Sequence, residues 1–364
     1  MRLNFTSSVV IVSVFTLLFS ASCKNDVEIF APQSDVTLVY GLLNADDTIH
    51  QIKINKVFQG EDAVDQLAKD PSLSEYENLK AVLFELNSDG FGKYDTTNQW
   101  TLTEKTITNK DSGYFYYPNQ KIYELEAKLD NTKEYAVWID KLDGSKIVES
   151  KTELIKPTGD IIIRPLGLTF LGLSLADDNG PLDKVLLEMK MPINGKVMDV
   201  FLDFSWKDEY QDGSTSGLNT IQYKVGTYVV SKIPIDANDN IQVTAELNPT
   251  SFYEFIAAKV PVVPQGSNIK QRVPEDEPLN FRFVVGGNEF NTYLEVASPS
   301  TSILETKPEY TNVENGVGIF SCRTFQNKVA KMSKKSIVYL VDGEITAGRK
   351  FCNYANSTDP NYCF

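Results

Sequence analysis

The chain has 364 residues, of which 42% are hydrophobic, 23% charged and 11% aromatic, the proportions of an ordinary globular protein. These values exclude a disordered polymer, a collagen-like fibre and a bundle of membrane-spanning helices, and the length predicts one to three domains. The chain has a formal charge of −14 and is therefore repelled by the phosphates of nucleic acids, so we expect no nucleic-acid partner.

The N-terminus has the pattern of an export signal. Arg2 precedes an apolar stretch, residues 9–19, whose length of about 11 residues is too short for the roughly 20 that cross a bilayer. The small residues 20–22 then lead directly to Cys23, an arrangement that resembles the bacterial lipobox, although Ser20 stands where the usual pattern has leucine. The resemblance implies a signal peptide over residues 1–22, lipid on Cys23 and a tether over residues 23–34. The alternative is an ordinary signal peptide, which would leave a soluble exported protein.

Lipidation would decide how the protein meets the membrane. Two or more acyl chains anchor a protein stably, whereas one chain binds only marginally. Residues 24–28, Lys-Asn-Asp-Val-Glu, resemble the surface-export signal of Bacteroidota lipoproteins. We therefore predict attachment to the lipid bilayer through acyl chains at the outer membrane, on its extracellular face, with a periplasm-facing lipoprotein as the alternative.

Residues 35–157 alternate apolar and polar side chains with the period of strands, beginning at residues 36–42. Turn residues separate the later strand candidates, which are 80–86, 99–103, 113–117, 122–129, 135–140 and 146–155. One helix is expected near residues 61–69, ending before Asp70 and Pro71. The pattern predicts an antiparallel β-sandwich of immunoglobulin-like or transthyretin-like type.

Residues 158–364 are predicted to form a second β-rich domain with short helices. Its strand candidates are 167–175, 184–191, 199–206, 222–233, 240–247, 279–285 and 293–297. A short helix is expected over residues 252–259, with an N-cap within residues 249–251, and residues 327–341 are expected to be partly helical. Residues 262–278 are predicted to be an exposed loop. The fold class predicted for the whole chain is therefore mainly β.

Three cysteines remain after Cys23. In an oxidising compartment one pair is expected to form a disulfide. Cys352 and Cys363 flank a turn-rich segment that suits a small closed loop, and we predict this bond, with Cys322 bonding to either of them as the alternative. No metal site is expected, because the chain has no CxxC pair and its single histidine, His50, is far away in sequence.

Residues 308–320, PEYTNVENGVGIF, resemble the closing signature of a family of Bacteroidota lipoproteins of unknown function. Members begin with a lipid-bearing cysteine and carry an N-terminal β-sandwich that opens on a strand like residues 38–43, LVYGLL. The resemblance implies an outer-membrane lipoprotein, sometimes encoded beside TonB-dependent receptors, and no catalytic residue. Physically, Asn315 and Gly316 suit a turn with positive φ, and Gly318 a close approach of two backbones before Ile319 and Phe320 enter the core.

No residue pattern indicates catalysis. His50 follows acidic turn residues and is expected to be exposed at a hairpin tip, so we do not expect it to act as a base. Residues 236–240 resemble the first half of a calcium loop but lack its later glycine and glutamate, and residues 177–180 also read as a polar turn. We expect no cofactor. Hydrolysis by carboxylates alone stays open, with residues 206–212 as the place to look.

Two further patterns concern sugars. Thr48 and Thr96 stand in short sequences that resemble the O-glycosylation sites of exported Bacteroidota proteins. Residues 114–117, Tyr-Phe-Tyr-Tyr, together with Tyr310, are candidates for a carbohydrate-stacking face, although strand aromatics more often fill a core.

The sequence therefore predicts a non-enzymatic, lipid-anchored accessory subunit that docks on an outer-membrane β-barrel protein. The alternative is a surface lipoprotein that binds a glycan or a nutrient, in a groove with an exposed aromatic residue such as Trp206 or Trp100. An envelope hydrolase is a third hypothesis.

Overall fold

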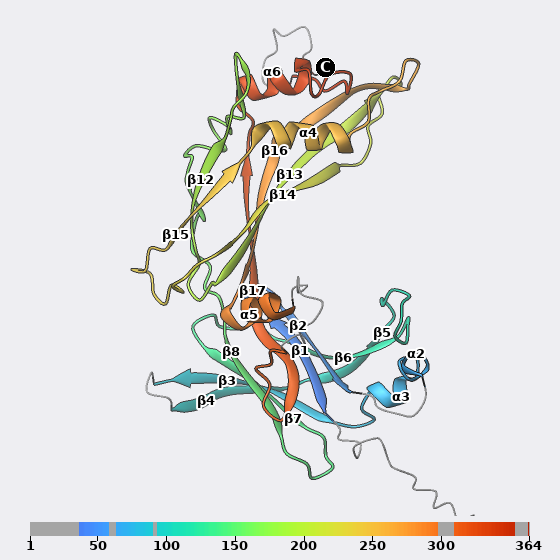
Figure 1. The fold of residues 1–364 in the computed structure, drawn as a ribbon, viewed down its shortest axis with the longest axis vertical. Coiled ribbons are helices and arrows are strands. Elements are labelled where there is room, and N and C mark those ends of the chain that lie inside the picture. The colour runs from blue at the N-terminus through green and yellow to red at the C-terminus, as the bar shows by residue number, and fades with distance from the viewer. Residues whose placement is uncertain (1–35, 58–62, 90–92, 298–308, 354–362, 364) are drawn as a thin grey trace, which may run out of the picture. The chain divides into compact units, whose positions relative to one another are not determined.

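The computed structural model describes residues 36–57, 63–89, 93–297, 309–353 and 363, and the fold is mainly β, as predicted (Figure 1). Residues 36–364 belong to one compact unit. Within the described residues, no helix is long and apolar enough to span a bilayer.

The largest sheet has eight strands in the spatial order β14-β13-β16-β17-β1-β2-β6-β5. In that order the strands are β14 (Asn219–Val229), β13 (Val197–Tyr210), β16 (Ile269–Gly286), β17 (Gly316–Ala330), β1 (Thr37–Leu43), β2 (Ile49–Lys56), β6 (Gln120–Glu126) and β5 (Thr103–Ile107). The two predicted domains, 35–157 and 158–364, therefore share one sheet.

The other strands of the described part of the chain form three smaller sheets. The four-stranded sheet contains β4 (Tyr94–Thr101), β3 (Lys80–Ser88), β7 (Glu134–Asp140) and β8 (Val148–Glu153). The three-stranded sheet contains β15 (Gln242–Leu247), β12 (Val185–Lys190) and β9 (Ile162–Arg164), and a small hairpin contains β10 (Ala176–Asp177) and β11 (Gly180–Pro181).

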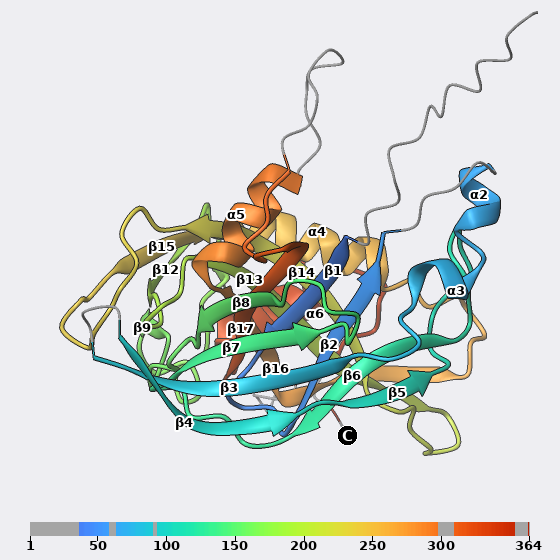
Figure 2. The ribbon, with the colours of Figure 1, turned by 90° about the horizontal axis from the view of Figure 1, so that it is seen from below.

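The N-terminal strands form two facing layers, which Figure 2 shows with β3 and β7 crossing β1 and β2. Alternate residues of β1, among them Val39 and Leu43, are buried, as are Ile52 and Ile54 of β2. These side chains share one apolar core with residues of the four-stranded sheet such as Val137. The alternation read from the sequence therefore marks the inner face of a sandwich.

Strand β17 joins the two parts of the large sheet. Its first half, from Gly316 to Cys322, runs parallel to β1, and its second half, from Arg323 to Ala330, pairs antiparallel with β16. One strand thus continues from the N-terminal sandwich into the C-terminal β-rich region.

The segment before β17 explains the glycine-rich signature. Asn312 pairs with the backbone of Phe320 as a strand would, because its Oδ1 accepts from the Phe320 N–H at 3.0 Å and its Nδ2 donates to the Phe320 carbonyl at 2.7 Å. Asn315, rather than Gly316, takes the positive φ of the turn, at 55°. Gly318 has a φ of 119°, and a Cβ there would lie 2.1 Å from the carbonyl oxygen of Val39. The expected close approach of two backbones is confirmed at Gly318.

Among the described residues, five short helices lie around the sheets. They are α2 (Val64–Leu67), α3 (Pro71–Ser74), α4 (Pro249–Lys259), α5 (Asn288–Ala297) and α6 (Lys334–Asp342). Helix α4 begins three residues earlier than predicted because Asn248 is its N-cap, accepting from the Ser251 N–H at 2.8 Å. The helix predicted near residues 61–69 is α2, which ends before Asp70 and Pro71 as expected, and these two residues begin α3.

Four predictions of local structure were wrong. The predicted strand at residues 293–297 is the end of helix α5, whose apolar residues recur at helical spacing, and most of the predicted loop at 262–278 is strand β16. Residues 113–117 form no strand, and their aromatic side chains are mostly exposed. Residues 167–175 also form no regular strand, because Gly167 and Gly172 both have positive φ.

Candidate functional site

The predicted cysteine sites fall in different places. Cys23 lies outside the described residues. Cys352 and Cys363 are joined by a disulfide with a Cα–Cα distance of 5.1 Å. Cys322 is a buried free thiol, and burial, with a contribution from Glu289, raises its pKa to about 12. It therefore carries almost no thiolate at neutral pH and suits a structural role.

His50 was expected to be exposed at a hairpin tip, and this prediction was wrong. It lies in β2 on the inner face of the sandwich, only 4% exposed, and its Nε2 is 3.0 Å from the carbonyl oxygen of Ala127. Burial lowers its pKa below the usual value, so the ring is neutral at pH 7. The neutral Nε2–H donates to Ala127, which makes His50 a core residue that links β2 to the chain after β6.

The acidic segments proposed as calcium-like loops are turns stabilised by their own side chains. Asp177 Oδ1 accepts from the Asn179 N–H at 2.7 Å, and Asp236 Oδ1 accepts from the Asn238 N–H at 2.7 Å. Within the described residues, no group of three or more histidine, cysteine, aspartate or glutamate side chains could hold a metal ion.

The aromatic candidates are of two kinds. Trp206 is 7% exposed, stacks on Phe204 at 5.7 Å between ring centroids and donates from Nε1 to Asp208 at 3.0 Å. It belongs to the core of β13 and offers no face to a sugar. Tyr114 and Phe115, in contrast, are about half exposed on the loop between β5 and β6. The threonines of the two glycosylation motifs, Thr48 and Thr96, are exposed.

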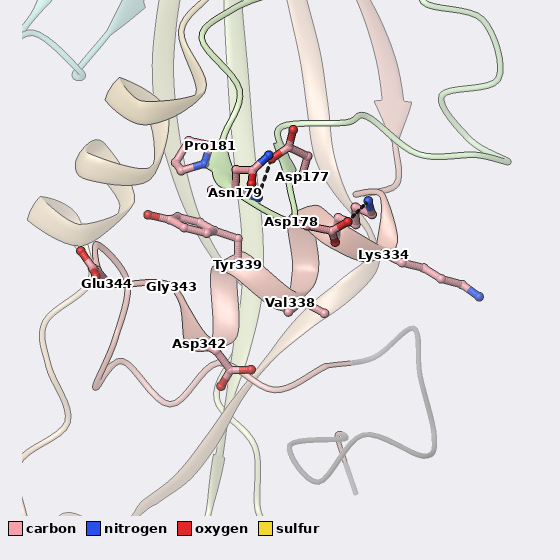
Figure 3. Close-up of a pocket in the computed structure, with 12 residues that line it drawn as sticks. Asp177, Asp178, Asn179, Pro181, Lys334, Val338, Tyr339, Asp342, Gly343 and Glu344 are labelled. Atoms are coloured by element: carbon pink, nitrogen blue, oxygen red, sulfur yellow. Dashed lines mark hydrogen bonds and ion pairs between the residues drawn. The ribbon is translucent and has the colours of Figure 1, made fainter.

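One hollow of about 680 Å³ lies between the β10–β11 hairpin and α6 (Figure 3). Tyr339 extends from α6 toward Asn179 and Pro181 of the hairpin, while Lys334 points away from it. The hollow is lined by Asp177, Asp178, Asn179, Gly180, Pro181, Lys334, Lys335, Val338, Tyr339, Asp342, Gly343 and Glu344.

The hollow is polar and open. Lys335 Nζ lies 2.7 Å from Asp178 Oδ2, and this carboxylate raises the pKa of Lys335. Both side chains are more than half exposed, so the pair contributes little to stability. Burial raises the pKa of Tyr339, whose ring packs 4.8 Å from that of the buried Tyr253. Such a hollow suits the polar side chains of a partner better than an enclosed small molecule.

The second feature of this region is a loop that points apolar side chains into solvent. In residues 166–171, which we call the apolar loop, Leu166 is 72% exposed, Phe170 87% and Leu171 70%. Only Leu168 points inward, and it is 3% exposed. Single exposed apolar residues are common, but three on one short turn are typical of an interaction site.

The apolar loop is held firmly by the chain that follows β17. The Leu168 carbonyl accepts from the Lys331 N–H at 2.9 Å, and the Leu173 N–H donates to the Lys331 carbonyl at 2.7 Å. A Cβ on Gly172 would lie 2.6 Å from the backbone of Met332, so the loop sits directly against it.

Ser336 of α6 joins the loop to the hollow. Its hydroxyl accepts from the Leu175 N–H at 2.7 Å and lies 3.2 Å from the Leu173 carbonyl, to which it donates. Helix α6 therefore supports both the apolar loop and the hollow, and we call these two features together the α6 surface. This surface was not predicted from the sequence, because the alternating leucines and phenylalanine of the loop are typical of a strand. The signal of a turn was the pair of glycines, Gly167 and Gly172.

No protein-family model and no curated protein matches this chain. Among solved structures, it is similar to the C-terminal globular domain of an oligosaccharyltransferase from Pyrococcus abyssi, with 10% identity and a TM-score of 0.24. That alignment covers 70% of this chain and 49% of the archaeal one. It is also similar to CBD12 from CALX1.2, with 7% identity, a TM-score of 0.17, and coverage of 73% of this chain and 88% of the other. Similarity at this level carries no functional argument.

Proposed function

We propose that this protein is a lipid-anchored accessory subunit that docks, through the α6 surface, on an outer-membrane β-barrel protein. The lipid on Cys23 rests on the sequence pattern at the N-terminus. The observation that carries the docking is the apolar loop, which exposes Leu166, Phe170 and Leu171 together. Large apolar side chains that gather on an otherwise polar surface are the usual centre of a protein interface.

The rigidity of the apolar loop favours binding. Its backbone is fixed by the hydrogen bonds of Leu168 and Leu173 to Lys331, which flank the exposed residues 170 and 171, so a partner would not have to order it. Binding then requires little ordering of the backbone, and the remaining conformational cost is that of the three side chains. The hollow beside the loop offers carboxylates and a lysine for the polar rim that such interfaces carry.

The charge of the chain favours a protein partner over the protein's own bilayer. The net charge of −14 opposes contact of the α6 surface with anionic headgroups.

The test is recovery of the native protein through a C-terminal tag from gently solubilised membranes. A stoichiometric β-barrel protein should accompany the wild type, and the double variant Phe170→Ser/Leu171→Ser should retain roughly a tenth or less of it, since two central apolar contacts contribute about 2 kcal/mol or more. The control is Leu218→Ser/Ile235→Ser, which removes two exposed apolar side chains outside the α6 surface. A wild type that is recovered alone, or equal recovery with both double variants, would refute the proposal.

A further inference from the structure

A separate groove lies near the beginning of β17, where α5 packs over the outer face of the β1–β17 pair. Two adjoining hollows of about 610 Å³ each share Tyr40 of β1 and Tyr293 of α5. We call them together the tyrosine groove. The groove is also lined by Asp47, Gln51, Glu309, Tyr310 and Arg323.

Tyrosine rings dominate the middle of the groove. Tyr40 and Tyr293 meet edge to face with 6.5 Å between ring centroids, and Tyr40 is 41% exposed although it lies in a central strand. Tyr310 lines the same hollow as both of them. Partial burial raises the pKa of Tyr40 and of Tyr310, so both hydroxyls stay protonated and can donate as well as accept hydrogen bonds.

The groove also carries polar groups at both ends. One hollow contains Asp47, Gln51 and Arg323, and the other contains Glu309. Arg323 forms no ion pair with any carboxylate in the part of the chain that the structure describes; its guanidinium lies 5.0 Å from the ring of Phe325. The groove therefore combines the apolar faces of its tyrosine rings with well-separated hydrogen-bond donors and acceptors. This is the chemistry of a site that binds a polyhydroxylated ligand.

The arrangement disfavours other occupants. A peptide cannot extend the sheet here, because β1 is already paired with β17 on one edge and with β2 on the other. An acyl chain would cover the Arg323 guanidinium without offering it a counter-charge. An anionic saccharide would meet Asp47 and Glu309 on a protein of net charge −14.

We propose that the tyrosine groove binds a neutral oligosaccharide. The C–H faces of the sugar rings would pack on Tyr40, Tyr293 and Tyr310, and their hydroxyls would bond to the carboxylates and the guanidinium at the two ends. Two hollows joined at Tyr40 and Tyr293 accommodate a chain of sugar units better than a single one. The proposal is independent of docking at the α6 surface, which lies at the other end of β17.

The experiment uses the mature protein and an array of neutral gluco-, manno-, galacto- and xylo-oligosaccharides, followed by calorimetry on each ligand retained. We expect binding to at least one of them. The variant Tyr40→Ala/Tyr293→Ala should weaken it at least about tenfold, because loss of one aromatic contact already costs a substantial part of that factor. Tyr94→Ala is the matched control, since Tyr94 is 36% exposed but lies outside the groove, and it should leave the affinity unchanged.

A second variant separates binding from folding. Arg323→Gln changes an exposed side chain at the end of the groove and should weaken binding without changing the thermal midpoint. The proposal would be overturned by the absence of binding across the array, by binding that Tyr40→Ala/Tyr293→Ala leaves intact, or by preferential binding of an anionic polysaccharide such as alginate.

Discussion

Replacing Gly318 by alanine should destabilise the protein more than any other single added methyl group in the signature. At a φ of 119° an alanine is strained by about 1–3 kcal/mol. Its Cβ would also lie 2.1 Å from the Val39 carbonyl oxygen, where contacts shorter than 3.0 Å essentially never occur. Strand β1 would therefore have to move by most of an ångström away from β17, and fully buried Val39 would lose its packing. We expect a total loss of about 4 kcal/mol.

The matched control is Gly213→Ala. Gly213 also has a positive φ, of 82°, but nothing lies within 4 Å of its added Cβ. The Gly213→Ala variant should lose only about 1 kcal/mol of its free energy of unfolding, from the strained backbone conformation alone. Urea unfolding followed by tryptophan fluorescence and far-ultraviolet circular dichroism measures both variants. If the two free energies of unfolding agree within about 0.5 kcal/mol, the close approach of β1 to β17 is not what position 318 requires, and the reasoning fails.

Three further predictions concern His50, the disulfide and Cys23. Burial lowers the pKa of His50 below its unfolded value near 6.5, so the free energy of unfolding is highest above that pH and falls as the pH decreases, by at most about 1.4 kcal/mol per pH unit. His50→Gln should flatten this dependence in urea titrations between pH 5 and 7. An unchanged slope would contradict the prediction. Removing the disulfide with Cys352→Ser/Cys363→Ser should lower the free energy of unfolding by about 2–3 kcal/mol. The thermal midpoint should be lower and should no longer change when reductant is added. A midpoint equal to that of the oxidised wild type would argue against this prediction. Cys23→Ser should move the protein from the detergent phase to the aqueous phase in Triton X-114 partition, whereas continued partition into detergent would disprove acyl anchoring.

Local patterns predicted the sandwich well because alternation records which side of a strand is covered. Val39 and Leu43 alternate with exposed or half-buried neighbours, and all that this requires is one apolar face. The same rule failed at residues 166–171, where period-two apolar residues lie on a turn and most of them point outward. The pattern states that side chains are apolar, but it does not state whether this chain or a partner covers them.

The surroundings of the candidate site residues depended on contacts between distant parts of the chain even more than the strands did. His50 reads as a turn residue from its acidic neighbours, but its environment is set by Ala127, 77 residues away. Trp206 reads as part of an acidic loop, although Phe204 and Phe351 enclose it. The tyrosine groove combines Tyr40 with Tyr293, more than 250 residues apart in the chain.

The sequence alone determined the strand-rich character of the chain and the special backbone at Gly318, because side-chain alternation and the freedom of glycine are local properties. Only the tertiary structure decided that β17 joins both halves of one sheet, that α5 stands over Tyr40, and that the apolar loop faces solvent. The physical reason is that strand pairing uses backbone groups common to every residue, so its partners are chosen by the packing of the whole chain.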